Sequence, residues 1–155
     1  MSLRQQLNDS MKEAMKAKDA KRLATLRLVL AALKDRDIAA RTESSRDLLG
    51  DDEILQLMAK MIKQREESAV AYDAGNRPEL ATGEREEIAI IRSFMPAQMD
   101  EAGVKAAAQT VIAELGAASI KEMGKVMAAM KERYAGQMDF ARASAIVKEI
   151  LSAPK

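Results

Sequence analysis

A basic stretch near the end of the chain carries the residues best suited to bind an anion. In SIKEMGKVMAAMKERY, residues 119–134, Lys121 and Lys125 are four apart and flank Gly124. Residues three or four apart lie on one face of a helix, so the two ammonium groups would form a basic edge. Without a side chain at Gly124, an RNA backbone could come close while the lysines meet its phosphates. The candidate nucleic-acid-binding residues are Lys121, Gly124, Lys125, Lys131 and Arg133.

A packing role competes with RNA contact as the explanation of Gly124. A glycine inside a helix costs roughly 1 kcal/mol relative to alanine, so its presence needs a reason. Gly124 and Ala128 are four apart and would form a flat strip that another helix or a loop could approach closely. Because small residues are commonly used at helix contacts, the sequence alone favours packing.

Other candidates for chemistry have simpler explanations. The acidic run at residues 51–53 could hold Mg²⁺ or Ca²⁺, but acids in a first helical turn are already favoured by capping and by the helix dipole. Ser44 and Ser45 with Lys34 suggest a serine–lysine nucleophile pair, yet no glycine-rich elbow surrounds them and a polar linker explains them. We therefore expect no catalytic residue and no metal site.

The composition excludes several classes of enzyme site. The 155 residues include no Cys and no His, which excludes thiolate nucleophiles, zinc sites built on sulfur or imidazole, and histidine general bases. We expect no cofactor. The eleven methionines, with only two Tyr and two Phe, are expected to fill the core rather than line a partner groove.

The charges are unevenly spread although the net charge is only +1. Residues 1–40 contain nine Lys or Arg against five Asp or Glu, residues 41–96 eight against twelve, and residues 97–155 eight against seven. The N-terminal hairpin is thus the most basic segment, and it is the alternative anion site, around Lys16, Lys18, Lys21 and Arg22.

No segment resembles a secretory signal or a membrane span. The N-terminus lacks a basic segment followed by an apolar run, and no stretch approaches the ~20 apolar residues that cross a bilayer. These observations predict a cytoplasmic protein with no membrane partner.

Apolar residues at helical spacing predict helices throughout, and no strand pattern is found. We expect a helical hairpin up to about Arg41 with Asp19 capping its second member, and a long helix from the acidic run to Gly75. Pro78 suits the first turn of the next helix, which stops before Pro96 because proline disfavours helical geometry in the preceding residue.

Three further helices are expected after Pro96. Asp100 and Asp139 are placed to cap the first and last of them, Ser119 and Glu122 match a capping box for the middle one, and Gly116 ends the first. The predicted fold class is all-α, with a helical N-terminal domain over residues 1–95 and a three-helix tail domain over residues 96–155.

Several motifs resemble one family across nearly the whole chain. Met123-Gly-Lys-Val-Met127, Gly136 and the ending VKEIL at 147–151 resemble the tail domain shared by the YqeY family and the C-terminus of the GatB subunit of the glutamine-dependent tRNA amidotransferase. The segments 14–19, 62–68 and 94–99 are similar to the N-terminal half of stand-alone YqeY proteins. The chain departs from the family motif at Glu122, where Asp is usual, and at Met138-Asp-Phe140, which replaces Ala-Asp-Gly.

The resemblance implies a GatB/YqeY-type tail that engages tRNA and performs no chemistry. It predicts a non-catalytic tRNA-binding or tRNA-amidotransferase-associated helical module. The expected partners are tRNA and a tRNA-modifying or aminoacylation-related protein. Two alternatives stay open: an accessory subunit or enzyme of carbon–nitrogen ligase type with glutamine as amido-N-donor, and a protein-interaction module that uses the Met-rich faces.

Overall fold

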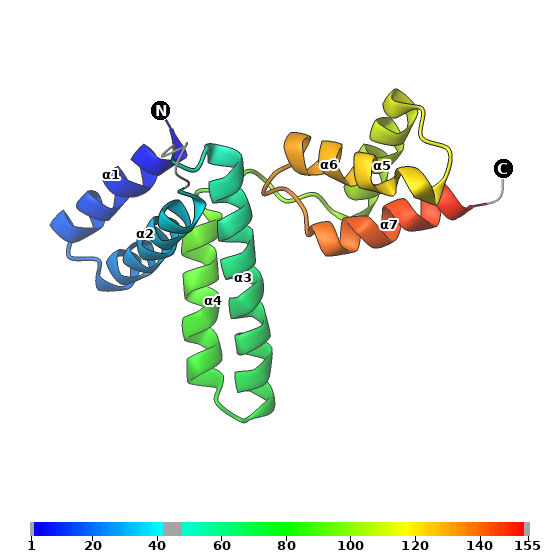
Figure 1. Cartoon of the computed structure of the whole chain (residues 1–155). Helices are drawn as coiled ribbons and strands as arrows, with labels where there is room; N and C mark the ends of the chain where they lie inside the picture. The colour runs from blue at the N-terminus through cyan, green and yellow to red at the C-terminus, as the bar shows by residue number, and fades with distance from the viewer. Residues whose placement is uncertain (1, 42–47, 154–155) are drawn as a thin grey trace. The chain divides into compact units, whose positions relative to one another are not determined.

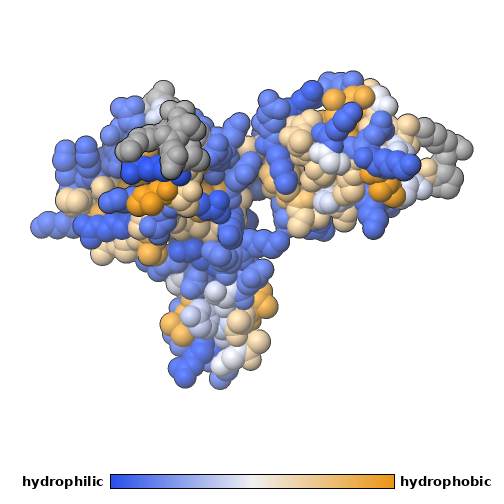
Figure 2. Space-filling view, viewed as in Figure 1, coloured by the Kyte–Doolittle hydropathy of each residue, from blue (hydrophilic) through white to orange (hydrophobic). Residues whose placement is uncertain are grey.

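A computed structural model describes residues 2–41 and 48–153 of the chain (Figure 1). These residues form seven α-helices and one 3₁₀ turn and contain no strand, which confirms the predicted all-α class. By their contacts the helices divide into two compact units, a first unit at residues 1–95 and a second unit at residues 96–155. Figure 2 shows that hydrophilic residues cover much of the visible face of each unit.

The first unit consists of two helical hairpins. Helices α1 (Leu3–Lys16) and α2 (Ala20–Ala40) pack together, and α3 (Asp51–Ala74) lies along α4 (Pro78–Arg92) (Figure 1). The predicted cap is confirmed at Asp19, whose side chain accepts a hydrogen bond from the Arg22 N–H. Apolar side chains of all four helices form one core, in which Leu7, Leu26, Ile54 and Ile91 are fully buried.

An ion pair within this unit connects the start of α1 to the end of α2. Arg4 Nη1 and Nη2 donate to the two carboxylate oxygens of Asp37 at 2.8 and 2.9 Å. Asp37 also accepts a hydrogen bond from the Leu49 N–H at 3.1 Å, and Arg4 donates to the Leu49 carbonyl. Hydrogen bonding to Arg4 holds the pKa of Asp37 below its ordinary value, against the opposing effect of burial. The pair therefore fixes residue 49, just before α3, against α1 and α2.

The second unit is a three-helix bundle. It contains α5 (Glu101–Leu115), the 3₁₀ turn η1 (Ile120–Glu122), α6 (Met123–Arg133) and α7 (Phe140–Ser152). The predicted caps Asp100 and Asp139 accept hydrogen bonds from Gly103 N–H and Ala141 N–H. Gly116 ends α5 in the left-handed conformation at φ 65°, which glycine adopts without strain. Its core residues are Val104, Ala107, Ala108, Val111, Val126, Met130, Met138, Ala143 and Val147.

The start of α6 differs from the sequence prediction. The capping box at Ser119 and Glu122 is present, but it opens the 3₁₀ turn, and α6 itself begins at Met123. Gly124 therefore lies in the first turn of α6. Nine of the ten described methionines are buried or half-buried and Met15 is exposed, so packing is their main use. Ser44 and Ser45 lie outside the described residues.

Candidate nucleic-acid interface

Four of the five predicted site residues come together on one exposed face. Lys121 lies in η1, and the turn continues into α6, which carries Gly124, Lys125 and Lys131. Spacings of three, four and seven residues place Ala128 and Lys131 on the helix face that contains Gly124, with Lys121 and Lys125 beside it. All five positions are exposed. We call this set, Lys121, Gly124, Lys125, Ala128 and Lys131, the α6 basic face.

The backbone at Gly124 is open. A Cβ placed there would meet no heavy atom within 4 Å beyond the local helix, and Ala128 one turn later is exposed as well. The sequence-based preference for close helix packing at this strip is therefore wrong. The reason is that the apolar side of α6, which includes the fully buried Val126 and Met130, faces the core, and the small residues lie on the other side.

The three lysines of this face are available to an external anion. Within the part of the chain that the structure describes, Lys121, Lys125 and Lys131 form no ion pair. The ammonium groups can therefore bind an anion without first losing an internal carboxylate. Glu132 is exposed four residues after Ala128, so one acid borders the face.

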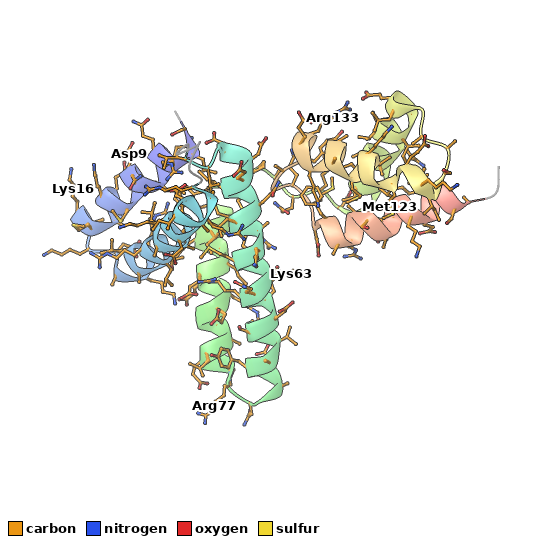
Figure 3. The ribbon with its side chains drawn as sticks, viewed as in Figure 1. Asp9, Lys16, Lys63, Arg77, Met123 and Arg133 are labelled. Carbon is orange, nitrogen blue, oxygen red and sulfur yellow. The ribbon has the colours of Figure 1, made fainter. Side chains whose placement is uncertain are left out.

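Arg133 does not belong with the other four residues. It is the last residue of α6, at the opposite end from Met123 (Figure 3), and its Nη1 donates to Glu114 on α5. This hydrogen bond raises the pKa of the Arg133 guanidinium. Its partner Glu114 on another helix could not be identified from spacing along α6. Arg133 stays a predicted nucleic-acid-binding residue, but its guanidinium already has an internal partner.

Sequence reasoning assigned Ala128 to the wrong role and left out Glu132. Its spacing from Gly124 predicts a packing role for Ala128, but Ala128 is exposed and extends the open strip. Glu132 is four residues after Ala128, and this helical spacing could have placed it beside the face. Its carboxylate lowers the positive potential of the face. The face can bind an anion through ammonium groups and an accessible backbone.

A groove lies between α5 and α7 in the second unit, and we call it the α5–α7 groove. It has a volume of about 410 Å³, and Ile146 and Ile150 form its apolar part, while Lys105 and Glu149 contribute opposite charges. None of the five predicted site residues lines it.

Among residues 2–41 and 48–153, no group of three or more acidic side chains is placed to hold a metal ion. In the same residues, no helix is long and apolar enough to cross a membrane.

The alternative basic site on the N-terminal hairpin is partly used for packing. Lys21 Nζ lies 3.7 Å from the carboxylate of Glu87 on α4, and the Arg22 guanidinium lies 5.2 Å from the ring centre of Phe94. The exposed Lys16 ends α1, and the exposed Lys18 lies in the turn between α1 and α2. Two of the four cations of that site therefore already have partners within the first unit.

Gly124→Ala is expected to raise the free energy of unfolding of the second unit by up to about 1 kcal/mol, because alanine has less backbone entropy to lose and meets no neighbour. Thermal unfolding by circular dichroism measures this as a rise of a few degrees. Gly116→Ala is the matched control and should lower the stability by roughly 1–2 kcal/mol, because its φ of 65° is unfavourable for alanine. A destabilised Gly124→Ala variant would show that the site is not open.

Comparison with known proteins gives consistent matches to one family. Residues 4–151 match the model of the family described as Yqey-like protein. Curated relatives named "Altered inheritance of mitochondria protein 41, mitochondrial" are 30% identical in Candida glabrata and 33% identical in Lachancea thermotolerans. Each alignment covers 89 residues, which are 57% of this chain and 47% and 46% of the two relatives. The matched part thus spans less than half of each relative.

The names of these relatives contradict the predicted cytoplasmic location. These relatives are named as mitochondrial proteins, and this finding overturns the prediction. The prediction of a cytoplasmic location was wrong because it was based only on the lack of a recognisable secretory signal and of a membrane span in the sequence. Neither feature distinguishes the cytoplasm from the interior of a mitochondrion.

Proposed function

The chain belongs to the Yqey-like protein family, and on this premise we propose that its second unit binds tRNA through the α6 basic face. In this proposal the protein is a non-catalytic module that holds tRNA for a tRNA-modifying or aminoacylation-related partner. The main support is the open backbone at Gly124 between lysines that have no internal ion pair among the described residues. Small residues at Gly124 and Ala128 leave room for a phosphate backbone, and the lysines supply the opposite charge.

The half-buried aromatic residues favour a binding mode in which the protein contacts RNA phosphates and surface shape rather than stacked bases. Tyr72, Phe94, Tyr134 and Phe140 are the four aromatic residues of the chain, and all are half-buried. Proteins that read splayed single-stranded bases usually stack them on exposed aromatic rings. Contact with a folded RNA such as tRNA instead depends on charge and surface shape, which the α6 basic face can provide.

Reversing two charges on this face is expected to weaken tRNA binding by the full chain at least tenfold. The variant Lys121→Glu/Lys125→Glu removes two phosphate contacts and adds repulsion. The slope of log affinity against log salt should fall by roughly 0.7–0.9 per lost contact. Fluorescence anisotropy with labelled total tRNA between about 50 and 200 mM salt measures both quantities.

A matched control separates the face from net charge. Lys105→Glu/Lys148→Glu makes the same change in charge on exposed lysines of α5 and α7, and its effect should be much smaller. Gly124→Leu keeps every charge but fills the open strip, so it should weaken binding without destabilising the unit. Equal losses in both double variants would contradict a specific site. Unchanged affinity and salt slope for Lys121→Glu/Lys125→Glu would move the RNA site to Lys16 and Lys18.

A further inference from the structure

Helix α2 exposes an apolar stripe on the side turned away from the core. Its inner side buries Thr25, Leu26, Val29, Leu33 and Asp37. On the opposite side Leu28 and Ile38 are 48% and 53% exposed. Together with exposed alanines and charged residues they form one stripe at helical spacing, which we call the outer α2 face: Ala24, Arg27, Leu28, Ala31, Lys34, Asp35 and Ile38.

The order of residues on this face is self-complementary about Ala31. When two copies of a helix pack antiparallel, residues equally far before and after the central residue lie opposite each other. Arg27 and Asp35 are each four residues from Ala31, so they would face each other with opposite charges. Ala24 and Ile38 are each seven residues away, so a large side chain meets a small one.

We propose that a second copy of this chain docks on the outer α2 face, with the two α2 helices antiparallel and the two-fold axis at Ala31. A two-fold interface must use the same patch on both copies, and this face meets that condition. The Arg27–Asp35 pair then forms twice. The small side chain of Ala31 lets the helices approach closely at the axis, where a larger residue would meet its own copy.

The charged residues of the face are free to make these pairs. Within the described ranges, Arg27, Lys34 and Asp35 have no ion pair or hydrogen bond through their side chains. The charges of this face therefore fit a second copy.

The face is small for a protein–protein interface. The stripe from Ala24 to Ile38 is about 21 Å long at 1.5 Å per residue. One such helix pair buries less than the roughly 1,200–2,000 Å² of a standard stable interface. An interface of this size is typical of weak, transient association, so the test must extend to high protein concentration.

Sedimentation equilibrium of the full chain from about 1 µM to 1 mM tests the proposal. The chain is expected to pass from monomer to dimer over this range, and Leu28→Glu is expected to shift the midpoint at least tenfold higher. Val70→Glu on α3 is the matched control, because Val70 is also an exposed aliphatic residue (66%) but lies off this face. A chain that stays monomeric at 1 mM, or a dimer equally weakened by both variants, overturns the proposal.

Charge exchange tests the antiparallel register independently of RNA binding. Arg27→Glu alone and Asp35→Lys alone place like charges opposite each other, and each should weaken the dimer about tenfold. The double variant restores opposite charges and should recover the original dissociation constant to within about threefold. Additive losses in the double variant would overturn the register. Thermal unfolding should be unchanged in all three variants, because both residues are exposed.

Discussion

Asp37→Asn is expected to lower the free energy of unfolding of the first unit by about 2–4 kcal/mol. The neutral amide cannot accept both hydrogen bonds from Arg4, and the guanidinium loses its counter-charge at a position where the Asp37 side chain is only 7% exposed. Because the Arg4 side chain is 25% exposed, solvent compensates part of the loss. The hydrogen bond from Leu49 also weakens, which loosens the start of α3.

Denaturant unfolding followed by NMR signals of the first unit measures this loss. Asp9→Asn on α1 is the control (Asp9 is labelled in Figure 3). The described residues include no partner for its side chain, so the change should alter stability by less than about 0.5 kcal/mol. Arg4→Met/Asp37→Leu replaces both charges with apolar groups and should recover part of the stability. An Asp37→Asn variant as stable as the control would contradict a structural role for the pair.

The same pair makes the first unit sensitive to acid. Folding lowers the pKa of Asp37, so the folded state favours the carboxylate. The stabilisation is therefore fully present above the ordinary Asp pKa of about 3.9 and is lost as the pH falls through the lower, folded-state value. Asp37→Asn should remove this part of the pH dependence, and its stability difference from the original chain should shrink in acid.

Met130→Ala should destabilise the second unit by about 2–5 kcal/mol and leave the first unit unchanged. Met130 is fully buried in the second core, so truncation removes apolar contacts and leaves a cavity. The two cores share no residue, and we propose that residues 1–95 and 96–155 unfold as separate domains. Leu26→Ala is the reciprocal variant, and it should destabilise only the first unit by a similar amount.

Amide hydrogen exchange measured residue by residue distinguishes separate from joint unfolding. In the expected result, Met130→Ala lowers protection only after residue 96 and Leu26→Ala lowers it only before residue 95. Loss of protection in both units from either variant would show that they unfold together. The two-domain prediction would then be wrong even though the helices form two compact units.

Local rules were sufficient to predict the helices from the sequence. Aspartates at 19, 100 and 139 cap the helices where an unpaired N–H needs an acceptor, and Pro78 begins α4. Gly116 ends α5 because its left-handed φ suits glycine. Each of these effects acts within about one helical turn. The residues involved are therefore close in sequence, and the all-α class and most helix ends could be predicted.

Tertiary structure alone decided the roles of residues whose partners are distant in sequence. Asp51 was expected to serve the helix dipole, but it also accepts a hydrogen bond from the Leu3 N–H at 3.1 Å. Asp37 is buried and forms an ion pair with Arg4, and Arg133 forms one with Glu114 on another helix. At Gly124, helical spacing shows which residues share a face but not whether that face meets a neighbour or solvent. That choice depends on how α6 packs against α5 and α7, because only this packing determines which side of the helix is buried.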